Sequence, residues 1–408
     1  MSTFTIVGAG QAGLQLAFGL LRDGHAVTVV SNRTPEDIRG GRVMSSQCMF
    51  DAALQHERDL GINLWEEECP DIEGISLVVP APDGSGVKAI DFAARLDRPA
   101  QSVDQRVKIP VLIEELERQG GKLVIEEAEL GDLERYARES DLVLVAAGKG
   151  DIARLFERDP GRSPYDAPQR ALALTSVTGM TPRPEYPAVC FNLIPTVGEY
   201  FVFPALTTSG ACEIMVFEGV PGGPMDCWAD VETPQQHLER SVSILETFLP
   251  WEAERNRSVE LTDDNGILAG RFAPTVRKPV GELPSGALVL GLADTVVLND
   301  PITGQGSNNA SRAAASYQES IRGHDGPYDR AFMEQTFERY WDYAQYVTGW
   351  TNALLGPPPP HVLEVLGAGN QHQAVAHRFV NGFNDPRDYF DWFMDPEQAG
   401  RYLAGLTA

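Results

Sequence analysis

The first 30 residues decide the fold, beginning with Phe4-Thr5-Ile6-Val7 and continuing as Gly8-Ala9-Gly10-Gln11-Ala12-Gly13. The apolar run predicts a buried strand, and the glycines after it predict a tight turn. Apolar residues then recur at helical spacing as far as Gly24, and residues 26–30 predict a second buried strand. A strand, a crossover helix and a second strand form a parallel βαβ unit, so the chain begins as an α/β fold.

A GxGxxG pattern in this context is typical of a dinucleotide site. The glycines permit the turn and let a pyrophosphate approach the backbone, and the N-terminus of the helix stabilises its charge. The residues predicted to bind the cofactor here are Gly8, Gly10, Gln11, Ala12 and Gly13. Ser31, Asn32 and Arg33 stand where an acidic residue usually binds the adenosine ribose. We therefore expect these groups to hold the nucleotide instead, and less firmly.

Further helices and strands of the parallel type are predicted after an interruption, and a region with a different residue pattern follows them. Residues 106–119 and 131–139 predict helices, and residues 122–126 and 141–148 predict strands. Between about 167 and 290, alternating apolar and polar residues broken by Gly and Pro predict an antiparallel sheet. One helix is expected within it, beginning at Thr233 with Pro234 in its first turn.

A parallel strand is predicted again at residues 287–291, and helices dominate from there to the end of the chain. The nucleotide fold is therefore expected to be discontinuous, with a sheet domain inserted between its parts. We predict a cofactor domain over 1–70, 98–165 and 284–345, a substrate domain over 71–97 and 166–283, and C-terminal helices over 346–408.

Composition excludes several classes of function. Of the 408 residues, 33 are Lys or Arg and 58 are Asp or Glu, which gives a formal charge of -25. Nucleic acids and anionic membrane surfaces are disfavoured as partners, because they would be repelled. No apolar run approaches the ~18 residues of a membrane helix, and no signal peptide is recognised. Five scattered cysteines without a CxxC pair indicate no disulfide framework and no metal site, so we expect a cytoplasmic protein.

A second motif indicates which dinucleotide is bound. The predicted strand at 287–291 leads to Asp294, an acid able to hydrogen-bond a chain of hydroxyls, and the sequence from Asp300-Pro301 to Asn308 opens a helix. The amides at such a helix start can face the electron-rich pyrimidine end of a flavin ring. The two features together predict FAD. They add to the cofactor-binding residues Gly148, Asp294, Pro301, Gly304, Gln305, Gly306 and Asn308.

This three-part pattern resembles the p-hydroxybenzoate-hydroxylase-like FAD monooxygenases. The resemblance implies a Rossmann-like FAD domain with an inserted antiparallel substrate sheet and a helical C-terminal region, and it implies flavin contacts from Arg42 and Arg106. The segments 42–47, 102–106 and 350–352 are similar in order and spacing to those of the oxygenase component of two-component styrene and indole monooxygenases. That likeness covers nearly the whole chain.

Six pocket positions separate the styrene and indole branches of that family. The matching positions here follow the indole pattern at all six, and they are Ser45, Gln47, Met49, Ile72, Ile75 and Ala100. From the residues alone, the apolar ones would be core and Ser45 and Gln47 could share one face of a strand. The resemblance implies that Met44 and Ile302 join these six in binding substrate, and that Ser45, Gln47 and Pro301 have positioning roles in catalysis.

The resemblance further implies an activity. Reduced FAD would react with molecular oxygen to a C4a-hydroperoxide and epoxidise the C2=C3 bond of indole, leading to indoxyl and indigo, with styrene and aryl sulfides as further substrates. Such a transfer needs no metal and no nucleophilic side chain, and the sequence shows no motif for either. Because the chain leaves no room for a reductase domain, a separate NADH-dependent flavin reductase is the expected source of FADH2. A homodimer is compatible with this reading.

Four alternatives stay open. The protein could be a styrene monooxygenase, or a self-sufficient hydroxylase that reduces its own FAD with NAD(P)H. A flavin-dependent halogenase is disfavoured because the WxWxIP motif is missing. A flavin-fold binding protein without redox chemistry is disfavoured by the intact loop from Asp300 to Gly304, whose amides would have no purpose there.

Overall fold

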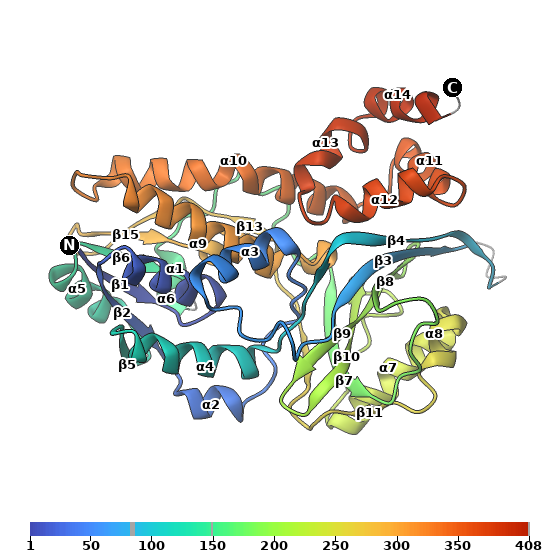
Figure 1. The fold of residues 1–408 in the computed structure, drawn as a ribbon, viewed down its shortest axis with the longest axis horizontal. Helices are drawn as coiled ribbons and strands as arrows, with labels where there is room; N and C mark the ends of the chain where they lie inside the picture. Colours follow the sequence, from blue (N-terminus) through green and yellow to red (C-terminus); the bar gives the residue numbers. More distant parts are fainter. Residues whose placement is uncertain (82–85, 148–149, 407–408) are drawn as a thin grey trace.

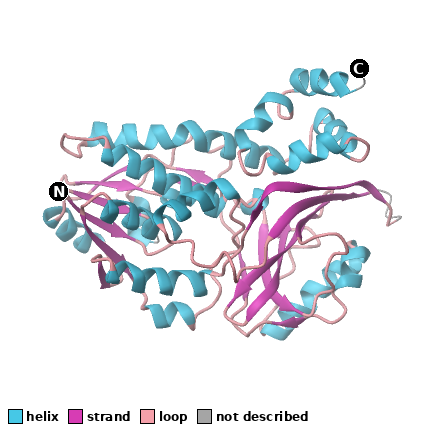
Figure 2. Ribbon diagram, viewed as in Figure 1, coloured by secondary structure: helices cyan, strands magenta, loops and turns pink. Residues whose placement is uncertain are grey.

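The computed structural model describes residues 1–81, 86–147 and 150–406, so the predicted cofactor residue Gly148 lies outside the described residues. Two sheets lie side by side, and helices cover them (Figures 1 and 2). No helix among the described residues is long and apolar enough to cross a membrane. All five cysteines are free.

The first sheet carries the βαβ unit predicted at the N-terminus. Its strands pair in parallel except for β14, which pairs antiparallel with β15. In spatial order the strands are β14 (Val280–Glu282), β15 (Leu288–Gly291), β6 (Leu142–Val145), β1 (Thr3–Val7), β2 (Ala26–Ser31) and β5 (Lys122–Ile125).

Helices cover this sheet on both faces (Figure 1). They are α1 (Gln11–Arg22), α2 (Pro35–Arg39), α3 (Asp51–Leu60), α4 (Gln105–Arg118), α5 (Leu130–Glu139), α6 (Gly150–Arg154), α9 (Gly306–Arg322) and α10 (Arg330–Leu354). Helix α1 packs against α9, so the two glycine-rich helix starts come from neighbouring elements. The C-terminal edge of the parallel strands is therefore where the two predicted motifs meet.

The second sheet is mixed, and it contains the alternating stretches of the middle of the chain. Most neighbours pair antiparallel, while β3 pairs parallel with β8. The order is β11 (Glu260–Leu261), β7 (Ala171–Thr178), β10 (Gly210–Gly219), β9 (Gly198–Thr207), β8 (Ala188–Ile194), β3 (Ile72–Pro80) and β4 (Lys88–Ala100), and β12 (Ile267–Gly270) also pairs with β7. A small ribbon joins β13 (Thr275–Val276) to β16 (Val297–Leu298).

The two faces of the second sheet are covered differently. One face packs on α7 (Pro234–Phe248) and α8 (Pro250–Arg255) through a core that contains Met215 and Phe217. Helix α7 begins where the sequence predicts, because Thr233 accepts a hydrogen bond from Gln236 N–H in a capping box and Pro234 occupies the first turn. The other face is an aromatic and aliphatic surface that faces the cavity described below.

The C-terminal region is helical, as predicted, and lies over β4 and the end of α10 (Figure 1). It contains α11 (Pro360–Gly369), α12 (Gln373–Asn381), α13 (Tyr389–Trp392) and α14 (Pro396–Leu406). The prolines at 357–360 separate α10 from α11, because proline cannot continue a helix from its preceding residue. Short 3-10 turns occur at Ala293–Thr295, Pro301–Thr303 and Pro386–Asp388.

Candidate active site

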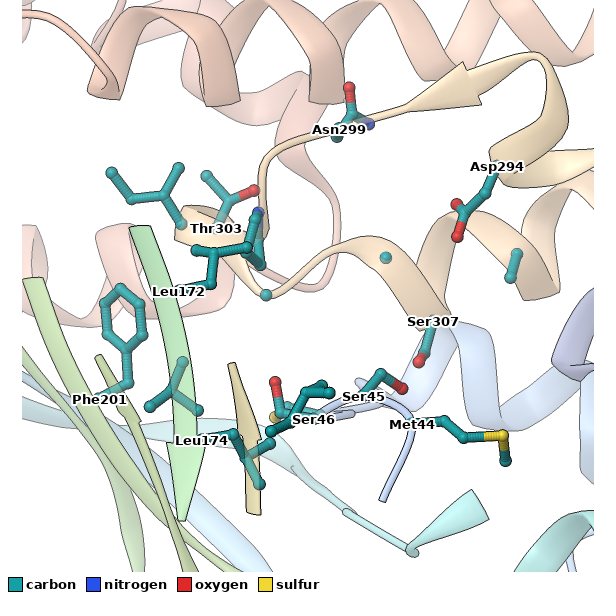
Figure 3. A pocket seen from close by; sticks show the side chains of 18 of the residues that line it. Met44, Ser45, Ser46, Leu172, Leu174, Phe201, Asp294, Asn299, Thr303 and Ser307 are labelled. Carbon is teal, nitrogen blue, oxygen red and sulfur yellow. The ribbon is translucent and has the colours of Figure 1, made fainter. Parts of the chain in front are cut away.

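A cavity of about 650 Å³ lies between the glycine-rich loops of the first sheet and the apolar face of the second. That volume is typical of a site for a small molecule or part of a cofactor. In Figure 3, Asp294, Ser307 and Met44 lie toward one end, and Phe201, Leu172 and Leu174 lie toward the other. The cavity thus has a polar end near the parallel sheet and an apolar end on the second sheet.

The turn after β1 brings backbone to the polar end. Gly8 has φ +120° and a Cβ there would meet the backbone of Ala146 at 2.8 Å, while a Cβ on Gly13 would lie 2.0 Å from the carbonyl oxygen of Gly8. These two glycines are required by packing. Gly10, by contrast, has no atom within 4 Å of a Cβ position and lines the cavity with Gln11, Ala12 and Gly13.

The second loop approaches the same space from α9. Asp300 accepts a hydrogen bond from Ile302 N–H at 3.2 Å, and Gly304 closes the turn with φ +63°. Gly304, Gly306 and Ser307 line the cavity beside the first turn of α9, where helix amides lack intrahelical partners. The donors and the space at this end fit the pyrophosphate and ring edge of a flavin nucleotide.

Asp294 completes the polar end. It follows Ala293, whose φ of +51° is unusual for a residue other than glycine and marks a strained turn. The carboxylate is exposed to the cavity but is surrounded by protein, and this burial raises the pKa of Asp294 to about 6, while the charge of Arg277 opposes the shift. A carboxylate in this position fits a hydrogen bond to a sugar-like hydroxyl chain.

Apart from Ile75, the apolar end is built from residues that the sequence did not single out. Alternate side chains of neighbouring strands form it, and the list is Ile75, Leu172, Leu174, Val189, Phe191, Phe201, Phe203 and Val216. The rings of Phe191 and Phe201 lie 4.3 Å apart. The alternation at 200–203 predicts a strand, but the sequence carries no signal for which face of it meets the cavity.

The structure separates the predicted substrate residues into two groups. Those that line the cavity are Met44, Ser45, Ile75 and Ile302, together with Pro301 of the predicted positioning residues. Those that are buried and do not line it are Gln47, Met49, Ile72 and Ala100. The segment 42–47 is not a strand, so the strand interpretation of Ser45 and Gln47 is wrong.

Local contacts explain why this second group faces away from the cavity. Gln47 donates from Nε2 to the carbonyl oxygen of Val103 at 2.5 Å and accepts from Ser45 Oγ at 3.2 Å. Met49 packs with Ala53 and Leu54. Ile72 and Ala100 face each other as a pair between β3 and β4. The amide nitrogen and the amide oxygen of Gln47 are thus both hydrogen-bonded within the protein, outside the cavity lining.

Two predicted flavin contacts are also placed elsewhere. Arg106 is buried, and its guanidinium is bound by Asp104, Asp263 and Thr207 at 2.8 to 3.1 Å, so it does not line the cavity. Burial opposes its charge, but these hydrogen bonds raise the pKa of Arg106. Arg42 is exposed and lies outside the cavity lining. Sequence alone did not reveal that Asp263 would satisfy Arg106.

The remaining predicted cofactor residues, Ser31, Asn32, Arg33, Gln305 and Asn308, do not line the cavity. Ser31 is buried and donates to the carbonyl oxygen of Arg33 at 2.8 Å, while Asn32 is exposed. Gln305 donates to the carbonyl oxygen of Phe383 at 2.9 Å. Asn308 accepts from Phe50 N–H and donates to the carbonyl oxygen of Cys48, both at 2.8 Å. Gln305 and Asn308 therefore anchor the second loop to its neighbours and do not face the cavity.

Comparison with known proteins gives this site a family. Residues 148–255 match the family model described as "Styrene monooxygenase A putative substrate binding domain". The chain is 32% identical over 406 residues to styrene monooxygenase StyA of Pseudomonas fluorescens, which covers 97% of this chain and 96% of that protein. It is also 32% identical over 408 residues to styrene monooxygenase StyA of a Pseudomonas species, covering 98% and 97%.

Solved structures with the same fold are more distant in sequence. A triple mutant of the flavin-dependent brominase Bmp2 superposes with a TM-score of 0.65 at 13% identity, and each chain is covered completely. PqsL from Pseudomonas aeruginosa, a probable FAD-dependent monooxygenase, superposes with a TM-score of 0.60 at 14% identity, covering 92% of this chain and 99% of that one. These similarities confirm the predicted fold class of flavin-dependent oxygenases and halogenases.

Proposed function

The chain belongs to the family of styrene monooxygenase StyA and is a flavoprotein monooxygenase, and we propose that its preferred substrate is indole. The proposal is that it acts as the oxygenase component of a two-component system, epoxidising the C2=C3 bond with reduced FAD and molecular oxygen. Indoxyl, and then indigo, are the expected products. Styrene and aryl sulfides are proposed as further substrates.

The observation that carries the proposal is the continuity of the cavity. It extends from the two glycine loops, whose backbone fits a flavin nucleotide, to an aromatic surface large enough for a bicyclic ring. When bound and reduced, FAD would supply the oxygen-transferring chemistry. Gly10 to Gly13, Asp294 and the loop from Pro301 to Gly306 would hold it.

The apolar end of the cavity would exclude water and orient the substrate. The rings of Phe191, Phe201 and Phe203 exclude water from the reacting atoms and stack on a flat aromatic substrate. Pro301 and Ile302 also line the cavity and would orient the double bond toward the flavin. No acid, base or nucleophile is needed for an electrophilic oxygen transfer to an electron-rich alkene.

Support for indole comes from the six pocket positions that match the indole branch. Two of them, Ser45 and Ile75, line the cavity. Ser45 Oγ accepts a hydrogen bond from Gln105 Nε2 at 2.9 Å, so its place in the pocket is held from α4. A separate NADH-dependent flavin reductase, a cytoplasmic location, a homodimer and the domain limits given above belong to the same proposal. The free cysteines suit a reducing compartment.

The test supplies chemically reduced FAD and oxygen to the purified protein with equal amounts of indole and styrene. We expect indole to be consumed first, with indoxyl and indigo formed without any reductase. Faster consumption of styrene would favour the styrene alternative, and no oxidation of either would overturn the assignment. Turnover with NADPH and unreduced FAD alone would instead support the self-sufficient hydroxylase.

A further inference from the structure

The chemistry proposed above makes no use of Glu218, a buried carboxyl group at the wall of the cavity. Glu218 lines the cavity, yet 0% of its surface is exposed to water. Neither of its carboxyl oxygens receives a hydrogen bond from a donor among the described residues. An unpaired buried acceptor is unfavourable, so its retention here calls for a partner that the protein itself does not supply.

The strand geometry directs Glu218 toward the cavity. Side chains alternate along β10, and Ile214 and Val216 belong to the core on the cavity face, while Met215 and Phe217 belong to the opposite core. Glu218 continues the first series by two residues. It therefore forms the polar end of an otherwise apolar wall.

Among the described residues no ion pair is formed with Glu218, although the charge of Arg170 lies near it. Its cross-strand neighbour in β9 is Glu199, which is bound on both oxygens by Arg170 at 2.6 and 2.9 Å. The third nitrogen of Arg170 donates to the carbonyl oxygens of Gln169 and Leu355. Arg170 and Glu199 thus balance each other, and the second carboxyl near Glu218 is that of Asp300.

Asp300 is a second carboxyl close to Glu218. Burial, and then the nearby charges of Asp300 and Glu199, raise the pKa of Glu218 well above its usual value, and burial also raises the pKa of Asp300. The charge of Asp300 thus disfavours the ionised form of Glu218. Neither neighbouring group donates a hydrogen bond to Glu218, so its carboxyl group keeps an acceptor without a donor among the described residues.

We propose that Glu218 accepts a hydrogen bond from the ring N–H of a heteroaromatic substrate and thereby selects such substrates over hydrocarbons of the same shape. The inference rests on the proposed function and specifies its substrate class. Apolar walls treat indole and indene alike, whereas a site built for an N–H group leaves a buried acceptor unpaired when the N–H is missing. Ser45 and Gln47 were predicted to have positioning roles, but Gln47 does not line the cavity and is hydrogen-bonded to Ser45 and Val103.

The experiment measures binding and needs no turnover. Isothermal titration of indole and of its carbocyclic analogue indene is carried out on the protein saturated with oxidised FAD. We expect indole to bind at least about tenfold more tightly than indene. Glu218→Leu is expected to bring this ratio close to one, and Glu218→Gln, which keeps an acceptor oxygen, is expected to retain most of it.

Glu213→Leu is the matched control, because Glu213 is a partly buried carboxyl on the same strand at a position that alternates away from the cavity face. Its ratio should equal that of the wild type. A folded Glu218→Leu variant with the wild-type ratio would overturn the inference. So would a wild-type protein that binds indene as tightly as indole, a result that does not depend on any variant folding.

The two proposals fail in different ways. If indole is preferred in binding but reduced FAD yields no indoxyl, the proposed function fails and Glu218 still recognises the N–H group. If indole is oxidised but binds no better than indene, the function stands and the role of Glu218 is wrong.

Discussion

The two ends of the cavity are made by opposite means. At the flavin end, two short segments line the cavity, namely residues 10–13 and, with the exception of Gln305, residues 301–307. At the substrate end, single side chains from β3, β7, β8, β9 and β10 meet, although they are spread over residues 75–216. The first end depends on local conformation and the second on the pairing of distant strands.

Each end also keeps one carboxyl, and their environments differ. Asp294 is open to the cavity, where a hydroxylated ligand can reach it, whereas Glu218 is closed off from water beside Asp300. The flavin end is therefore suited to a polar ligand that keeps some contact with solvent. The substrate end is suited to a ligand that brings a single polar group into an apolar site.

Removing a ring from the substrate end should have the largest effect. Phe201→Ala deletes a buried ring that packs on Phe191 at 4.3 Å, and we expect the free energy of unfolding to fall by about 3 kcal/mol. FAD affinity should change less than about threefold, because each end is built independently. Urea denaturation and a fluorescence titration with FAD measure the two quantities.

Phe201→Leu is the conservative control for that variant and should cost less than about 1.5 kcal/mol. A loss of FAD affinity as large as the loss of stability would show that the two ends are coupled.

Adding a side chain at the flavin end should lower the affinity for FAD strongly and the stability of the fold only slightly. Gly10→Val adds atoms to open space at a position with an ordinary φ of -91°, so stability should fall by at most about 1 kcal/mol. The new methyl groups occupy the proposed pyrophosphate site, and FAD affinity should fall about a hundredfold, which is ~2.7 kcal/mol. Titration with FAD and thermal unfolding are the measurements.

Gly131→Ala, which also points into open space but lies in α5 away from the cavity, is the control and should leave FAD affinity unchanged. Unchanged affinity in Gly10→Val would mean that the first glycine loop does not hold the cofactor.

The smallest expected effect concerns pH and Asp294. Its pKa is raised to about 6 in the folded protein and is about 3.9 when unfolded, so the folded state binds more protons between these values. Stability of the cofactor-free protein should therefore fall as pH rises from about 4 to 6 and then level off. The Asp294→Asn variant should not show this fall in the free energy of unfolding. We expect the fall to be about 1 kcal/mol, because cavity water screens the carboxylate.

The measurement compares denaturation of the wild type and of Asp294→Asn at pH 4.5 and pH 7. Other buried carboxyls, such as Glu213 with a pKa of about 7, are present in both proteins, so only the difference between the two proteins is used. A difference that is the same at both pH values would contradict the shifted pKa.

Sequence reasoning succeeded where neighbouring residues act together. The turn from Gly8 to Gly13, the loop from Pro301 to Gly306 and the start of the helix at Pro234 are recognisable because their backbone geometry demands particular residues in a row. The predicted flavin contact of Arg106 was not found, because Arg106 pairs with Asp263. Asp263 lies 157 residues further along the chain, and no local sequence pattern predicts that ion pair. Gln47 and Met49 belong to the predicted substrate pattern, but their contacts with neighbouring segments place both outside the cavity lining.

The amino-acid sequence by itself determined the fold class, the two glycine loops and the family, because each depends on residues adjacent in the chain or on similarity along its length. Only the tertiary structure decided which side chains meet at the cavity. A strand exposes alternate residues to opposite faces, and the pairing of β7, β9 and β10 chooses the face. That choice places Phe201 and Val216 on the cavity wall and brings Glu218 beside Asp300, 82 residues further along the chain.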